Sequence, residues 1–361
     1  MAEIKLEGLR KTFRTEEAEV TAVKDLTLSF PSSSVTCLLG PSGCGKTTLM
    51  RMIAGLEKPS SGDIYFGDER VTDLSPSRRN IGMVFQYPVV YRGMDVFGNV
   101  ELPLKETGLS KRERRMRVEE VLETLELGSS ARKKVATLDN GTLQKVAVAR
   151  AVARRPRIIL FDEPITNVDA EAKVQLKTAL KNLTRQHKQT IVYVTHDQTE
   201  AMTLADEIAL MRDGEVIQRG SPDAVYKNPS ERFGGWFLGN PGMNFVAHTL
   251  RNGRLHAPLF ASPVPVRGDG EVTGVVLVGI RPERVQVTAN ARSGAVRAQV
   301  TQRAVVIGGQ HLLTLRVDEA TFKAKVPPSN TVTGSEVWVQ IPLEAVTLFS
   351  QDGQRLAATV G

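Results

Sequence analysis

Residues 40–48 constrain the fold of this chain more than any other segment. They read G-P-S-G-C-G-K-T-T and fit the phosphate-binding pattern G-x-x-x-x-G-K-[ST]. The apolar run Val35 to Leu39 before them predicts a strand, and Thr47 to Leu56 predicts a helix that ends near Gly55. Glycines allow the tight turn that gathers backbone amides at a helix N-terminus, where an anion is stabilised. A strand before and a helix after make an ordinary glycine-rich turn the weaker interpretation.

We expect this loop to hold the phosphates of a nucleotide. Lys46 supplies a point charge for the β- and γ-phosphates, and the Thr47 hydroxyl is a candidate Mg²⁺ ligand. The residues expected to contact the nucleotide are Gly40, Pro41, Ser42, Gly43, Cys44, Gly45, Lys46, Thr47 and Thr48.

Two adjacent acids follow a second predicted strand, Ile158 to Phe161. The first, Asp162, suits the Mg²⁺ shell, directly or through water, and the second, Glu163, suits an attacking water. Two acids after a strand would by themselves indicate a solvated turn. Together with the phosphate loop they indicate a nucleotide hydrolase.

Composition is that of a soluble globular protein, with 41% apolar and 24% charged residues. No apolar run approaches the roughly 18 residues that span a bilayer, and the first residues lack an apolar signal core. We therefore expect a cytoplasmic chain that docks onto something else if it works at a membrane. Its two cysteines, Cys37 and Cys44, fit a reduced compartment. Cys44 is either a thiol of lowered pKa at a helix N-terminus or, the favoured interpretation, a small residue at a variable loop position.

The net charge of +7 is compatible with nucleic acid or an acidic lipid surface as partner. The basic run 111–117 contains an acid and falls on a predicted helix, Leu109 to Leu125, so a solvated helix face is the better interpretation. The basic runs also lack the interleaved aromatic residues of a stacking platform. We expect no nucleic-acid partner.

The pattern along the chain predicts two domains. Strands and helices alternate up to about residue 235, which predicts an α/β domain with a mostly parallel sheet and a helical subdomain at about 88–155. Residues 236–361 have short alternating segments separated by turns, which predicts a small all-β barrel or sandwich. The strands predicted there are Val272 to Ile280, Val296 to Val300, Leu312 to Val317, Phe322 to Val326 and Val337 to Ile341.

With these motifs, nearly the whole chain resembles the ATP-binding subunit of an ABC importer of the maltose/glycerol-phosphate type. In that family the fold is a P-loop ATPase domain followed by an accessory β domain of the TOBE type. The motifs that carry the resemblance are Val84-Phe85-Gln86 (Q-loop), Thr166-Asn167-Val168-Asp169 (D-loop), Tyr193-Val194-Thr195-His196-Asp197 (switch), Gly242-Met243-Asn244-Phe245 and Gly279-Ile280-Arg281-Pro282-Glu283 (β domain).

The resemblance implies roles for four further residues. Gln86 would contact Mg²⁺ and the attacking water, and its loop would meet a membrane subunit. His196 would sense the γ-phosphate, Asp169 would lie at a dimer interface, and the ring of Phe13 in Lys11-Thr12-Phe13 would stack on adenine. The implied partners are transmembrane permease subunits and, indirectly, an external solute-binding protein. The implied location is peripheral, on the cytoplasmic face of the inner or plasma membrane.

One motif departs from the family. Its signature loop reads L-S-G-G-Q, whereas this chain has Leu138, Asp139, Asn140, Gly141 and Thr142 before an intact helix. In the family, ATP lies between one subunit's phosphate loop and the other subunit's signature. As a helix N-cap, Asp139 would accept a hydrogen bond from the backbone amide that otherwise binds the γ-phosphate. Its carboxylate would also place a negative charge beside the negative phosphate. Asn140 adds a Cβ where the family has glycine.

This departure favours a heterodimer with a second ATPase that has an intact signature. Glycerol and polyol importers with two unlike ATPase subunits resemble this arrangement. The run 85–91 also resembles the corresponding segment of that subgroup. The alternative is a homodimer whose variant loop still works, with Asp139 turned to solvent as a plain helix cap. A different class, an ABC ATPase that acts on nucleic acid or ribosomes, stays open, as does a regulatory role for the β domain.

Overall fold

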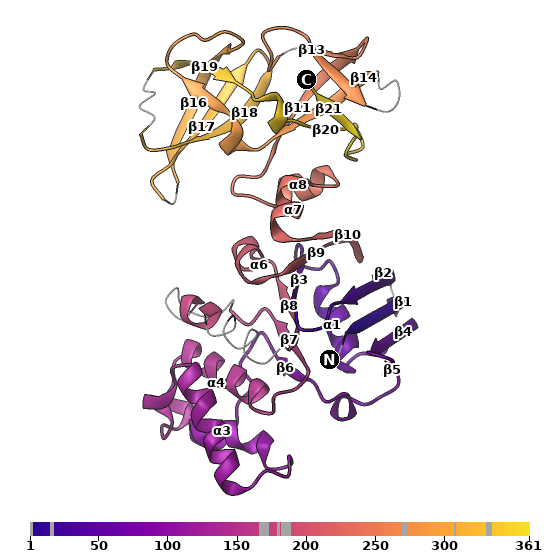
Figure 1. Cartoon of the computed structure of the whole chain (residues 1–361), viewed down its shortest axis with the longest axis vertical. Coiled ribbons are helices and arrows are strands. Elements are labelled where there is room, and N and C mark those ends of the chain that lie inside the picture. Colours follow the sequence, from indigo (N-terminus) through magenta and orange to yellow (C-terminus); the bar gives the residue numbers. More distant parts are fainter. Residues whose placement is uncertain are drawn as a thin grey trace. The chain divides into compact units, whose positions relative to one another are not determined.

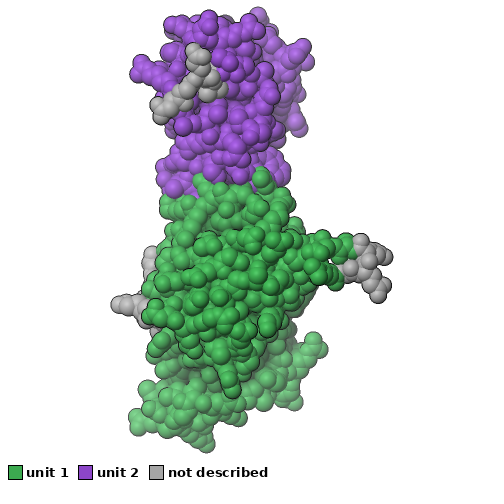
Figure 2. Space-filling model, turned by 90° about the vertical axis from the view of Figure 1, so that its right-hand side faces the viewer, with its two compact units in different colours: residues 1–222 green, residues 223–361 purple. Residues whose placement is uncertain are grey.

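The computed structural model describes residues 3–14, 18–165, 173–178, 181, 189–256, 258–268, 273–306, 308–329 and 334–361. The chain divides into two compact units, residues 1–222 and 223–361 (Figure 2). Each unit has its own hydrophobic core.

A largely parallel sheet forms the centre of the first unit (Figure 1), with strand order β10-β9-β3-β8-β7-β6. Only β10 pairs antiparallel with its neighbour. The strands are β3 (Val35–Leu39), β6 (Gly82–Val84), β7 (Ile158–Asp162), β8 (Thr190–Thr195), β9 (Glu207–Arg212) and β10 (Glu215–Gly220). Every residue of β3, β7 and β8 is buried, as expected for parallel strands covered on both faces. The strands predicted at 35–39 and 158–161 are confirmed.

An antiparallel sheet of order β2-β1-β4-β5 lies in the same unit. Its strands are β1 (Ile4–Arg14), β2 (Glu19–Phe30), β4 (Ser61–Phe66) and β5 (Glu69–Arg70). Helix α1 (Lys46–Ala54) shares one core with both sheets through Leu49, Met50 and Ile53. The helix ends as predicted at Gly55, which has a φ of 75° and whose amide caps the last carbonyls.

The helical part of this unit contains α2 (Val96–Glu101), α3 (Lys111–Thr124) and α4 (Asn140–Ala153), and α6 (Gln198–Leu204) follows β8 (Figure 1). Helix α3 begins with a capping box between Ser110 and Glu113. It buries Val118, Val121 and Leu122 and exposes most of its basic residues. The solvated basic face predicted for this segment is confirmed.

The second unit consists of two antiparallel sheets around one core, which confirms the predicted β-rich domain. The strand orders are β20-β14-β11-β12-β13-β21 and β15-β19-β16-β17-β18. The elements are α7 (Pro222–Lys227), α8 (Arg232–Phe237), β11 (Asn244–Arg251), β12 (Arg254–His256), β13 (Val264–Gly268), β14 (Gly274–Ile280), β15 (Gln286–Thr288), β16 (Val296–Val305), β17 (His311–Val317), β18 (Ala320–Val326), β19 (Glu336–Gln340), β20 (Thr347–Phe349) and β21 (Ala358–Val360).

The second unit begins earlier than residue 236, the expected start of the β domain, because a buried arginine holds the preceding helices. Arg281 lies at the end of β14 and is 5% exposed. Its guanidinium donates to the carbonyl oxygens of Tyr226 (2.6 Å), Gly235 (2.9 Å) and Leu238. Helices α7 and α8 therefore pack with the β strands.

Candidate active site

The phosphate loop has a backbone that only glycine accommodates at two points. Gly45 has a φ of 104°, and a Cβ built there would lie 2.2 Å from the carbonyl oxygen of Ala22 on β2. A Cβ at Gly40 would lie 2.3 Å from the carbonyl oxygen of Met211 on β9. The loop is therefore pressed between strands of both sheets, which fixes where its amides converge.

Lys46 is held inside this loop. Its side chain is buried, and Nζ donates to the carbonyl oxygens of Gly40 and Pro41, both at 2.8 Å. The Sγ of Cys44 lies 3.7 Å from the same ammonium. Burial raises the pKa of the Cys44 thiol, and Lys46 offsets this only in part. The raised pKa and the burial of Cys44 agree with the favoured interpretation of a small packed residue.

The Thr47 hydroxyl and the Asp162 carboxylate come from two distant segments and meet beside the phosphate loop. The Thr47 Oγ1 at the start of α1 donates to Asp162 Oδ1 at the end of β7, at 3.2 Å. Burial raises the pKa of Asp162, while the Thr47 hydrogen bond lowers it. A hydroxyl and a carboxylate beside a phosphate cradle fit Mg²⁺, which takes one or two carboxylates plus phosphate oxygens.

Glu163 and His196 meet at the ends of the adjacent strands β7 and β8. Glu163 Oε2 lies 3.0 Å from His196 Nδ1. The Glu163 amide donates to the Val194 carbonyl oxygen at 3.0 Å, and its φ is 45°, in the left-handed region. A non-glycine residue in that region costs about 1–3 kcal/mol and persists where the surroundings impose it, often at functional sites. The two residues proposed for water and γ-phosphate are thus brought together.

Three other predicted residues are placed less fully. Gln86 lies in the loop after β6, half-buried, and among the described residues no hydrogen bond joins it to Thr47 or Asp162. The Phe13 ring on β1 is 38% exposed, and Lys11 Nζ lies over the ring, 4.8 Å from its centroid. Asp169 and the rest of the predicted D-loop (166–169) lie outside the described residues.

The variant signature loop forms a closed helix cap. Asp139 is the N-cap of α4, and its carboxylate accepts the Thr142 amide (2.8 Å) and the Thr142 hydroxyl (2.8 Å). These hydrogen bonds lower the pKa of Asp139, so it is charged at neutral pH. The predicted cap is confirmed. The Thr142 amide in the first turn of α4 is therefore already bonded to the chain's own carboxylate.

Comparison with known proteins identifies the family. The ABC transporter family matches residues 23–166, and the TOBE domain matches residues 278–349. The sn-glycerol-3-phosphate import ATP-binding protein UgpC of Yersinia pestis bv. Antiqua (strain Antiqua) is 42% identical over 98% of each chain. The trehalose/maltose import ATP-binding protein MalK of Thermococcus litoralis is 39% identical, over 97% of this chain and 98% of that protein. This chain belongs to the ABC transporter family.

Solved structures agree with this membership. A dimeric post-hydrolysis state of the ATP-binding cassette MJ0796 with ADP and phosphate matches with a TM-score of 0.56 and 33% identity. It covers 61% of this chain, and this chain covers 98% of that one. This chain is therefore an ABC ATPase, which binds and hydrolyses ATP. No helix among the residues the structure describes is both long and apolar enough to cross a membrane.

Sequence reasoning missed two residues of this ABC ATPase that join the signature helix to the Q-loop. Gln144 on α4 is buried, and its Nε2 donates to the Phe85 carbonyl oxygen at 3.2 Å. Arg150, two turns further, donates to the Val89 carbonyl oxygen and lies 4.8 Å from the Tyr91 ring centroid. Because the acceptors are backbone atoms about sixty residues away, no local pattern in the sequence signals these contacts.

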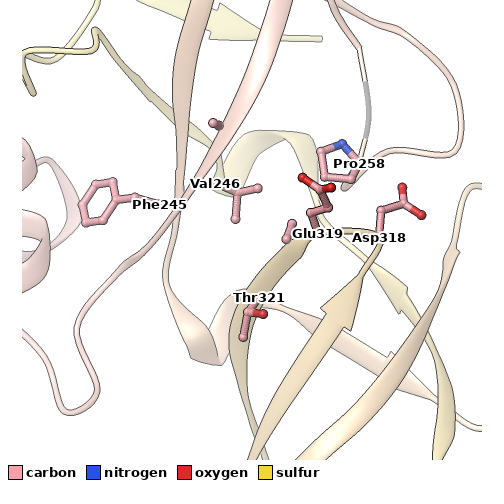
Figure 3. A pocket seen from close by; sticks show the side chains of 8 residues that line it. Phe245, Val246, Pro258, Asp318, Glu319 and Thr321 are labelled. Carbon is pink, nitrogen blue, oxygen red and sulfur yellow. The ribbon is translucent and has the colours of Figure 1, made fainter.

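The second unit also has a groove (Figure 3). Its volume is about 750 Å³, and its wall is formed by β11 and the β17–β18 turn. Asp318 and Glu319 extend from the turn beside Pro258, as Figure 3 shows. Burial lowers the pKa of His248, so its imidazole is neutral. Its Nε2 accepts a hydrogen bond from the Leu259 amide at 3.4 Å, which holds the segment next to Pro258 in place.

Proposed function

We propose that this chain is the ATP-hydrolysing subunit that energises a membrane importer for a sugar, a polyol such as glycerol, or a similar small solute. The carrying observation is the joint geometry of Thr47 with Asp162 and of Glu163 with His196 around the phosphate loop. The names of the similar import proteins support the solute class. The chain would act peripherally on the cytoplasmic face of the membrane, together with permease subunits and, indirectly, an external solute-binding protein.

The site residues divide the hydrolytic work. Thr47 and Asp162 would hold Mg²⁺, with Gln86 as a further contact, and the ion would neutralise charge on the β- and γ-phosphates. Lys46 binds the same phosphates. Glu163 orients and polarises the attacking water, and His196 steadies the γ-phosphate. Phe13 stacks on the adenine, and Asp169 belongs to the interface between two cassettes.

Replacing Glu163 tests this mechanism. We expect Glu163→Gln to retain ATP binding and to lower kcat by about 10²–10⁴-fold, because the amide cannot accept a proton from water. Radiolabelled ATP retention and phosphate release measure the two effects. Glu119→Gln, which removes an exposed ion pair with Arg115 on α3, is the matched control and should leave both unchanged. Full activity in Glu163→Gln would remove Glu163 from its role.

The Q-loop surface is the proposed contact for the permease. Tyr87 and Val89 are 70% and 56% exposed, and a groove of about 200 Å³ lies between this segment and α4. The buried Nε of Arg150 in that groove has no hydrogen-bond partner among the described residues. A permease segment that covers the apolar side chains and brings an acceptor oxygen would satisfy both features.

We propose that the functional ATPase is a heterodimer with a second cassette whose signature is intact. The partner's signature would complete the ATP site built on residues 40–48 of this chain, and that site would hydrolyse. The opposite site, which uses Asp139 and Thr142, would hold ATP weakly, because the Thr142 amide is already bonded. The purified chain alone should therefore show little cooperative hydrolysis. Normal cooperative turnover without a partner would instead support the homodimer.

A further inference from the structure

A buried acid in helix α6 has no role in the chemistry described so far. Glu200 is 3% exposed. Its Oε2 accepts the Tyr193 hydroxyl at 3.0 Å and the Thr195 hydroxyl at 2.8 Å. Tyr193 and Thr195 are alternate residues of β8 and therefore point to the same face of the strand. Burial and the neighbouring Glu200 raise the pKa of Tyr193 well above its usual value, so the phenol is a neutral donor.

These contacts form a capping box with one additional hydroxyl. Asp197 is the N-cap of α6 and accepts the amides of Thr199 (2.7 Å) and Glu200 (3.2 Å). In an ordinary capping box, the acid at the third helical position, here Glu200, accepts the N-cap amide directly. Here the Asp197 amide donates to Thr195 Oγ1 at 2.9 Å, and that hydroxyl donates to Glu200. The Thr195 hydroxyl thus relays the contact.

The relay brackets the switch histidine. His196 lies between Thr195 and Asp197: the Thr195 hydroxyl donates to Glu200, and the Asp197 amide donates to that same Thr195 hydroxyl. The His196 ring itself is half exposed, and its Nδ1 lies 3.0 Å from Glu163 Oε2. We propose that Glu200 is a positioning residue, which holds the backbone at 195–197 so that His196 Nδ1 faces Glu163. This inference rests on the proposed hydrolytic role of Glu163 and His196.

Three substitutions in the full-length chain separate positioning from packing. Glu200→Leu keeps the volume and removes the acceptor, and Thr195→Val removes the relay hydroxyl without changing its shape. Both should lower the single-turnover rate constant for ATP hydrolysis at least tenfold, while the half-saturating ATP concentration stays within twofold. Glu200→Gln keeps an acceptor oxygen and should retain at least half of the wild-type kcat.

Tyr193→Phe is the matched control. It removes a hydrogen bond to the same Glu200 oxygen, but that bond does not involve residues 195–197. It should lower the melting temperature while leaving kcat within twofold of wild type. If Glu200→Leu does not fold, Thr195→Val carries the comparison, since its side chain is isosteric. A Glu200→Gln variant as slow as Glu200→Leu, or a folded Thr195→Val with normal kcat, would overturn the positioning role.

A readout without ATP turnover distinguishes this inference from the proposed function. The chain has five histidines, so the imidazole signal of His196 can be assigned in a ¹³C-histidine spectrum by comparison with His196→Ala. The signal should move in Thr195→Val and stay in Tyr193→Phe; an unmoved signal in Thr195→Val would contradict the positioning role. An active Glu163→Gln would contradict the proposed function, and the histidine signal would still decide the role of Glu200.

Discussion

Restoring the signature loop should strengthen nucleotide-driven association of this cassette. The perturbation is Asp139→Ser together with Asn140→Gly, which returns two positions of the loop to the family pattern L-S-G-G-Q. The wild-type carboxylate occupies the Thr142 amide and hydroxyl, each at 2.8 Å. A γ-phosphate that took the same amide would displace this cap and still lie beside the Asp139 charge.

The magnitude follows from the Coulomb repulsion between the Asp139 carboxylate and a γ-phosphate. Two unit charges about 5 Å apart repel by roughly 3 kcal/mol at an effective dielectric of 20, about a hundredfold in affinity. Asp139 is exposed, so solvent screening reduces the effect, and we expect a gain between about tenfold and a hundredfold. The lowered pKa of Asp139 means that protonation does not relieve the repulsion at neutral pH.

The assay is ATP-dependent dimerisation of the full chain in a Glu163→Gln background, which keeps ATP intact. Analytical ultracentrifugation across an ATP titration gives the concentration at which half of the chain is dimeric. That concentration should fall at least tenfold in the double variant. Asp139→Asn separates charge from backbone, because asparagine caps a helix about as well as aspartate; it should recover most of the gain.

Asp95→Asn is the matched control, since Asp95 caps α2 by accepting the Gly98 amide at 2.7 Å and lies outside the signature. It should not change the midpoint. If neither signature variant lowers the ATP concentration at the midpoint, the electrostatic account of the loop is wrong.

Three further predictions concern the phosphate site. The pKa of Asp162 is raised in the folded state, so the stability that Asp162 contributes is present below about pH 4 and is lost as pH rises. Asp162→Asn should therefore raise the melting temperature at pH 7 and lose that advantage below pH 4. It should also abolish Mg²⁺-dependent hydrolysis. Gly45→Ala should destabilise the chain by roughly 2–5 kcal/mol in urea unfolding, whereas Gly43→Ala, with a φ of 81° and open space, should cost about 1–2 kcal/mol; equal losses would contradict the packing argument. Phe13→Ala should raise the KM for ATP about tenfold with unchanged kcat, and an unchanged KM would exclude stacking.

The sequence predicted the elements whose signal is local. The glycine spacing and Lys46 indicated the phosphate loop, and the uniformly apolar strands indicated the central parallel sheet. Asp139 was predicted as a helix cap because N-cap preference depends only on the residues of one turn. The capping partner, Thr142, is likewise three residues away.

Contacts between distant segments were not predictable in this way. The Gln144 and Arg150 contacts end on backbone carbonyl oxygens, which every residue has, so no residue type marks the acceptor. The hydrogen bonds by which Arg281 holds α7 and α8 in the second unit also end on backbone carbonyl oxygens, so they were not predictable either. The raised pKa of the Cys44 thiol comes from burial, which depends on what packs around the loop.

The sequence by itself determined that this chain can bind a triphosphate, because backbone curvature, a lysine and two acids are specified by local residue types. Only the tertiary structure decided how these parts work together. It placed Thr47 against Asp162, turned Glu163 into the left-handed region to meet His196, and joined Glu200 to Thr195. Hydrogen bonds between segments far apart in the chain depend on how strands and helices pack, and that arrangement exists only once the whole unit has folded.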